Sequence, residues 1–294
     1  MSIGRIVAAV ALEADVDPVA ARALQLARMH GAHLILVHVL ENLTLVEDDV
    51  AAWSALATLR QTLEDQARER IAHLLVGQDC PNVEIIIEHG RAHERIEAIA
   101  EAQKADLLVI GPGNPRTLGD KLFGSTADRL TRSGFSPVLV VRTPPKGPYR
   151  HVTVALDFSS SSAQALARAA ELASQPALQI VHVVDWPLPF EQAMLKAGTP
   201  MAEIEAYRRG KVQTARASID ALLGSNAPAG LAPNIRIIEG QPGDVLTGMS
   251  REGSIDLLAI GAHGRNIVAR ALLGSVARQV LQGAACDVLI VSAT

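Results

Sequence analysis

Short apolar runs alternate with longer stretches of helical periodicity along the chain. In the second half the apolar runs fall at 151–156, 178–184, 234–239, 256–260 and 287–292. Such unbroken runs are typical of strands that are buried on both faces of a parallel sheet. The stretches 161–174 and 202–224 carry apolar residues at helical spacing, and the second is expected to end at Gly224. The pattern predicts an α/β fold with a doubly wound sheet in each half.

The two halves of the chain repeat each other. Residues 105–141 align with 255–291 without a gap, and 12 of the 37 positions are identical. Between the halves, RTPPKGPYR (142–150) contains three prolines and one glycine, which is typical of a linker. The sequence therefore predicts two similar domains, at 1–143 and 150–294.

Composition narrows the class of protein. With 49% hydrophobic and 20% charged residues, the 294-residue chain is expected to be globular. A net charge of −4 argues against a nucleic-acid partner, which needs a basic face. No apolar run approaches the length of about 18 residues that a membrane span needs, so no membrane partner is expected. The two cysteines, Cys80 and Cys286, have no neighbouring His or Cys at a metal-ligand spacing and are typical of a reduced, cytoplasmic protein.

Three glycines stand out in GAHGRNIVARALLGSV (261–276). Gly261 follows an apolar strand, Gly264 lies in the next loop, and Gly274 with Ser275 precedes the last helix. A phosphate needs close backbone approach, which glycine permits, and free N–H groups, which a helix N-terminus provides. Arg265 adds a positive charge beside the loop. Each glycine taken alone is explained more simply as a turn or cap residue, but the combined pattern favours an anion site.

At these residues the chain resembles the ATP-binding universal stress proteins. The shared motif is Gly261-x-x-Gly264, nine residues, then Gly274-Ser275, and the resemblance extends over nearly all of both halves, including PVLVV (137–141) and DVLIV (287–291). It implies two repeated five-stranded parallel-sheet domains that form an internal pseudo-dimer. It also implies ATP as the ligand, with Mg²⁺ or Mn²⁺ bridging the phosphates.

The resemblance assigns site residues in the second half. Asp157, two residues after Ala155, would hold the nucleoside, and the backbone of Val183 would contact adenine. The loop and helix positions carried over are Gly261, His263, Gly264, Arg265, Gly274, Ser275 and Val276. Two alternatives stay open: Asp157 could share a helix N-cap with Ser159, and His263 could only support the turn. No catalytic residue and no metal ligand is identified.

The first half departs from the motif. Ala11 stands where Asp157 would be, and Gly113 and Asn114 replace His263 and Gly264. Asp128 replaces Arg278, so that Ser125-x-x-Asp128 has the pattern of a capping box, in which a carboxylate occupies the place of a phosphate. We therefore expect a degenerate first domain and a single ATP site in the second.

The expected function is that of an ATP-binding stress-response protein, a nucleotide-responsive binding or signalling module with an unidentified protein client. The first alternative is an enzyme of the nucleotide α-hydrolase or adenylate-forming type, and the second is an interaction module without ligand. The sequence lacks the Gly-Lys-Ser/Thr of a Walker motif and a base-activated nucleophile. Slow ATP hydrolysis and a homodimer of the whole chain are left open.

Overall fold

The proline-rich segment 142–150 contains no helix or strand and separates two units of the chain in the computed structural model. The units are Met1–Pro148 and Tyr149–Thr294. The structure describes residues 3–13, 16–41, 50–78, 80, 82–113, 124–133, 135, 137–173, 177–186, 188–226, 233–264 and 273–293.

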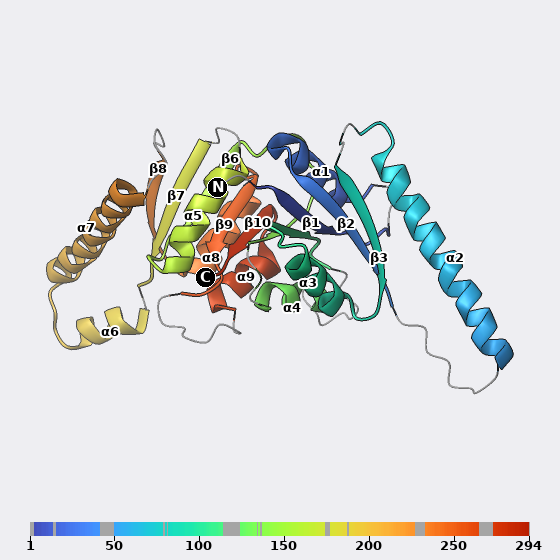
Figure 1. The fold of residues 1–294 in the computed structure, drawn as a ribbon. Coiled ribbons are helices and arrows are strands. Elements are labelled where there is room, and N and C mark those ends of the chain that lie inside the picture. The colour runs from blue at the N-terminus through green and yellow to red at the C-terminus, as the bar shows by residue number, and fades with distance from the viewer. Residues whose placement is uncertain are drawn as a thin grey trace. The chain divides into compact units, whose positions relative to one another are not determined.

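The first unit alternates strands with helices (Figure 1). Its neighbouring strands pair in parallel in the order β3-β2-β1-β4-β5. The elements in chain order are β1 (Arg5–Ala9), α1 (Pro18–His30), β2 (His33–Leu40), α2 (Val50–Leu75), β3 (Val83–His89), α3 (Ala92–Ala102), β4 (Leu107–Ile110), α4 (Ser125–Arg132) and β5 (Val138–Val140).

The second unit repeats this order of elements and adds one helix. Its strands are also parallel, in the order β8-β7-β6-β9-β10. The elements are β6 (His151–Ala155), α5 (Ser160–Leu172), β7 (Ala177–Val184), α6 (Leu188–Lys196), α7 (Met201–Asn226), β8 (Asn234–Glu239), α8 (Pro242–Arg251), β9 (Leu257–Gly261), α9 (Ser275–Gly283) and β10 (Asp287–Val291).

Fully buried strands form part of the core of each unit. Every residue of β4 and of β10 is buried, as expected for strands that helices cover on both faces. Helix α5 packs on β6, β9 and β10 of its own unit. The prediction of an α/β fold with a five-stranded parallel sheet in each half is confirmed.

One predicted boundary is wrong. Helix α7 continues to Asn226, so Gly224 lies inside the helix and does not end it. A glycine within a helix costs only about 1 kcal/mol, which the rest of a 26-residue helix outweighs. No helix that the structure describes is long and apolar enough to cross a membrane.

The strand order fixes where a ligand can enter the second unit. From β6 the chain moves outward through β7 to β8 and then returns to β9 on the other side of β6. The connections after β6 and β9 therefore diverge to opposite sides of the sheet. Such a point leaves a crevice at the carboxyl ends of the two strands, where ligands of open α/β sheets bind.

Candidate functional site

The turn after β6 holds the carboxylate of Asp157 at the crevice. Asp157 Oδ1 accepts hydrogen bonds from the backbone N–H of Ser159 at 3.0 Å and from its Oγ at 2.5 Å. Ser159 in turn is the N-cap of α5 and accepts from the N–H of Ser162. Asp157 thus supports the helix start through one carboxylate oxygen, as the N-cap alternative expected, and Oδ2 lies toward Gly264.

His182, in the neighbouring strand β7, contacts the backbone of this turn. His182 Nδ1 lies 2.6 Å from the carbonyl oxygen of Leu156, the residue before Asp157. Phe158 follows with a left-handed φ of 64°, and its ring centroid lies 4.7 Å from that of His182. A left-handed backbone is uncommon for a residue other than glycine, so the surrounding contacts determine the direction in which the chain leaves β6.

The loop after β9 comes close to the start of α9. The N–H of Gly274 donates to the carbonyl of Ala262 at 2.8 Å, and Gly274 is the N-cap of α9 without a side-chain cap. Within the described part of the chain, the first-turn N–H groups of Ser275 and Val276 have no acceptor. Those donors carry the partial positive charge of the helix N-terminus.

The three motif glycines face different neighbours. A Cβ on Gly261 would lie 2.7 Å from Ser161 Oγ and 2.9 Å from the backbone nitrogen of Ser162, so the packing of α5 already requires glycine there. A Cβ on Gly264 would lie 3.2 Å from Asp157 Oδ2, and one on Gly274 would lie 3.3 Å from the carbonyl oxygen of Ala262. Gly264 is therefore the glycine that borders the carboxylate.

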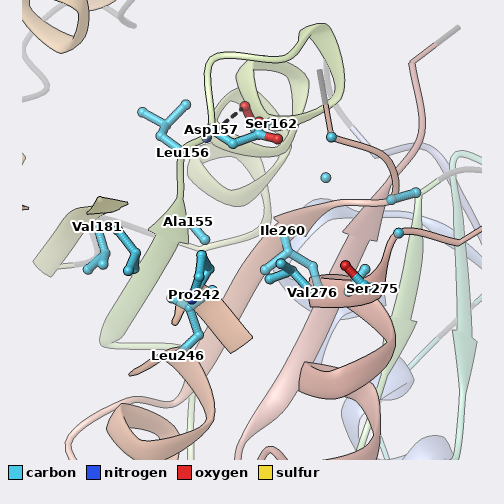
Figure 2. Close-up of a pocket in the computed structure, with 16 residues that line it drawn as sticks. Ala155, Leu156, Asp157, Ser162, Val181, Pro242, Leu246, Ile260, Ser275 and Val276 are labelled. Carbon is cyan, nitrogen blue, oxygen red and sulfur yellow. Dashed lines mark hydrogen bonds between the residues drawn. The ribbon is translucent and has the colours of Figure 1, made fainter. Parts of the chain in front are cut away.

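These elements enclose a cavity of about 270 Å³ (Figure 2). Eight of the ten site residues predicted from the sequence line it: Ala155, Asp157, Val183, Gly261, Gly264, Gly274, Ser275 and Val276. His263 is not among the lining residues. Its carbonyl accepts a hydrogen bond from Ser161 Oγ at 2.6 Å, and its buried Nε2 has no hydrogen-bond partner among the described residues. Arg265 lies outside the described residues.

Sequence reasoning missed the apolar end of the cavity. In Figure 2, Pro242 and Leu246 from α8 lie opposite Asp157 and Ser162. Leu156, Val181, Ile260, Ala262 and Ala277 also contribute to the lining. Pro242 is in the first turn of α8 and Leu246 lies one turn later. This spacing of four residues places both side chains on one face of the helix, and it is the signal in the sequence that could have identified them. The cavity thus has one aliphatic end and one end with a carboxylate and hydroxyl groups.

The equivalent turn in the first unit has no such carboxylate. Ile6 pairs with Leu107 as Val152 pairs with Leu257, so the strand register places Ala11 where Asp157 stands. His38 Nδ1 lies 2.8 Å from the Val10 carbonyl oxygen, as His182 lies near Leu156. The two units therefore share the fold of the turn, and they differ in the side chain that it presents.

The predicted capping box in the first unit is wrong. The N-cap of α4 is Gly124, no side chain caps it, and Asp128 Oδ1 pairs with Arg132 Nη2 at 2.8 Å. Ser125 is thus the first helical residue, and Asp128 falls one position beyond the place from which a capping-box carboxylate reaches back. Asp128 still adds a negative charge to the first turn. Asn114 lies outside the described residues.

Comparison with known proteins identifies the family. The profile described as "Universal stress protein family" matches residues 2–142 and 148–292. A universal stress protein of Mycolicibacterium smegmatis is 25% identical over 295 residues, which cover 95% of this chain and 93% of the relative. A universal stress protein of Mycobacterium tuberculosis H37Rv is 34% identical over 151 residues, which cover 50% of this chain and 98% of the relative.

Solved structures show the same fold. A functionally unknown protein from Pseudomonas aeruginosa PAO1 aligns with a TM-score of 0.64 at 19% identity, over 99% of this chain and 93% of that one. A universal stress protein from Archaeoglobus fulgidus aligns with a TM-score of 0.63 at 16% identity, over 99% and 98% of the two chains. The chain belongs to the universal stress protein family and contains two domains of that family in succession.

Proposed function

We propose that the second unit binds one molecule of ATP in the cavity between the carboxyl ends of β6 and β9. The observation that carries the proposal is the meeting of Asp157, the loop at Gly264 and the open N-terminus of α9 around one cavity. The first offers an acceptor for hydroxyl groups, and the last offers N–H donors and positive charge for phosphates. A nucleotide carries hydroxyl groups and phosphates in one molecule and so fits these features together.

The aliphatic end of the cavity suits the adenine ring. Val181, Pro242 and Leu246 supply apolar surface there, and small-molecule sites combine such surface with a few directed polar groups. The backbone at Val183 is the proposed partner of the adenine edge. Ser275 and Val276 at the start of α9 would face the phosphates, with Mg²⁺ or Mn²⁺ bridging the phosphates as part of the bound nucleotide.

In this proposal the protein is a nucleotide-responsive binding or signalling module of the stress response, and ATP occupancy governs its contact with a protein client. It would act in the cytoplasm, where the thiols of Cys80 and Cys286, which are not joined in a disulfide, stay reduced. Catalysis is secondary in this proposal, and the chain's own contribution is to bind and orient the nucleotide.

Isothermal calorimetry with ATP and Mg²⁺ or Mn²⁺ tests the proposal. We expect one ATP per chain. Ala155→Leu, which fills the cavity from the end of β6, should abolish binding, and the matched change Ala9→Leu in the first unit should leave it intact. ATP at about 100-fold over its dissociation constant should stabilise the second unit by about 2.7 kcal/mol, which raises its melting temperature by about 5–10 °C.

Three outcomes would contradict the proposal in different ways. Two equivalent ATP sites per chain would show that the first unit also binds nucleotide. No heat and no melting shift would favour an interaction module without ligand. Release of pyrophosphate that depends on a second substrate would favour the adenylate-forming or α-hydrolase enzyme.

A further inference from the structure

The first unit has its own cavity at the carboxyl edge of its sheet. It measures about 490 Å³ and is lined by residues at the ends of three strands, among them Ala9, Val37 and Ile110. This volume is larger than that of the cavity in the second unit and lies within the range of about 300–1,000 Å³ that small-molecule sites occupy. The loss of the nucleotide motif has therefore not closed the crevice.

The floor of this first cavity is aliphatic. Val10, Val37, Ile96, Ile110 and Leu130 all line it, and each is at most 5% exposed. Water gains few hydrogen bonds from such walls, and its replacement by an apolar molecule is favourable in proportion to the apolar area removed from water. The floor therefore favours a ligand with an apolar body.

The buried carboxylate that the described residues place at this floor, that of Asp17, already accepts hydrogen bonds through both oxygens. Asp17 is 6% exposed. Its Oδ2 accepts from the backbone N–H of Ala11 at 3.1 Å and of Leu12 at 3.5 Å, and its Oδ1 accepts from those of Val19 at 2.8 Å and Ala20 at 3.1 Å. With alanine at position 11, the turn offers no carboxylate to ribose hydroxyls, which are the groups that Asp157 is proposed to bind.

The charges around the first cavity also disfavour a nucleotide. Among the described lining residues, Asp17 and Glu13 carry two negative charges, against the positive charge of Arg142 and the uncapped N-terminus of α4. His38, the remaining titratable lining residue that the structure describes, places its Nδ1 beside the carbonyl of Val10. A triphosphate would meet these two carboxylates on the wall, and the loss of its hydration beside them is unfavourable.

We propose that the cavity of the first unit binds a small, uncharged, apolar molecule and excludes nucleotides. The exposed side chain of Val16, which is 61% exposed and also lines the cavity, would be covered by such a ligand. The duplication has then left two sites of different chemistry in one chain. This inference does not depend on whether the second unit binds ATP.

A pair of fluorescent probes tests the proposal on the full chain. N-phenyl-1-naphthylamine is uncharged, and 8-anilinonaphthalene-1-sulfonate has the same rings with one added sulfonate. We expect the uncharged probe to bind at one saturable site per chain and at least about tenfold more tightly than the sulfonate, since each factor of ten needs only about 1.4 kcal/mol. Excess ATP with Mg²⁺ should not displace it.

Matched variants place the probe in one unit or the other. Ala9→Leu should weaken the uncharged probe by about tenfold or more, because a filled cavity must repack to admit it, and Ala155→Leu should leave its affinity within about twofold of the parent value. Val16→Asp, at an exposed position that does not threaten folding, should weaken it by about threefold through loss of apolar contact. Circular dichroism checks that each variant is folded.

Each contrary result overturns the inference. If the uncharged probe has no saturable site, the cavity does not bind such a ligand. If Ala155→Leu abolishes binding of the probe, or if ATP displaces it, the probe binds in the second unit. Equal affinity for the sulfonate refutes the preference for an uncharged ligand. A second equivalent of ATP that disappears in Ala9→Leu refutes the exclusion of nucleotides.

Discussion

Replacement of Asp157 by alanine should weaken ATP binding through the loss of one oxygen, because the other oxygen serves the helix. Oδ1 is held by the N–H and hydroxyl groups of Ser159, whereas Oδ2 lies toward Gly264 at the cavity. A hydrogen bond to a charged group contributes about 1.5–3 kcal/mol. Asp157→Ala should therefore lower ATP affinity by about tenfold to 150-fold.

A double-mutant cycle separates the ribose contact from general damage. Calorimetry is run on the parent protein and on Asp157→Ala, each with ATP and with 2′,3′-dideoxy-ATP, which lacks the ribose hydroxyls. We expect the parent to prefer ATP by about the same factor that the substitution removes, and the variant to bind both nucleotides equally well. The coupling energy between carboxylate and hydroxyls is then about 1.5–3 kcal/mol.

A matched control accounts for the other oxygen. Ser159→Ala removes the hydroxyl that caps α5 and bonds to Asp157, and it leaves the carboxylate in place. It should cost about 1 kcal/mol of stability while the preference for ATP over the dideoxy nucleotide persists. If Asp157→Ala keeps the full preference of the parent protein, the carboxylate does not contact the ribose and its role is confined to the helix start.

Three further predictions follow from other contacts. Gly264→Val should abolish ATP binding and leave the melting temperature nearly unchanged, because its side chain would stand where the backbone is proposed to approach the phosphates, with its Cβ 3.2 Å from Asp157 Oδ2; ATP affinity at the parent level in calorimetry would contradict this. Burial acts to raise the pKa of Asp256, but hydrogen bonds from the N–H groups of His151 and Arg150 and the charge of His151 lower it below the ordinary 3.8. The resulting stability is present above pH 3.8 and lost as the pH falls further; it is less than about 1 kcal/mol for this mostly exposed group, and melting curves of Asp256→Asn between pH 2.5 and 6 should lack it. Residues 1–148 and 149–294, expressed separately, should each dimerise through the apolar closing strands β5 and β10, and monomers in sedimentation would refute the internal pseudo-dimer.

The repeat made much of the fold predictable. Alignment of the first strands by sequence set Ala11 opposite Asp157, and the pairing of β1 with β4 and of β6 with β9 gives the same correspondence. Strand positions followed from runs of apolar residues, because a strand covered on both faces has no polar side to interrupt the pattern. These features depend on local composition and on the twofold repetition of the chain.

The unpredicted features depend on contacts between distant or shifted segments. Ser161, which lies a hundred residues earlier in the chain, limits the space beside Gly261. The sequence does not show this contact, and it predicts only that Gly261 allows a phosphate to come close to the backbone. Asp17 accepts from the N–H of Ala11 because the turn before α1 folds back on itself. The prediction of a capping box at Ser125 was wrong because the helix starts one residue earlier, with Gly124 as its N-cap. Sequence patterns rarely resolve a difference of one residue.

Duplication within one chain distinguishes what the fold requires from what a ligand requires. Both units hold the strand-end carbonyl with a histidine, at His38 and His182. Two positions after the residue that carries this carbonyl, both units have a residue with left-handed φ, Leu12 and Phe158. The last helix of each unit begins at a glycine N-cap. Because these features persist in a unit without the nucleotide motif, they belong to the fold.

Asp157 and Gly264 behave differently from these shared features. They face each other at the cavity, and the first unit has lost both, with Ala11 and Asn114 in their places. The joint loss is expected if the two residues serve one ligand, since neither is then needed once that ligand is gone. The pair is therefore the part of the motif on which the proposed ATP site depends, and the other two glycines occur in both units as part of the fold.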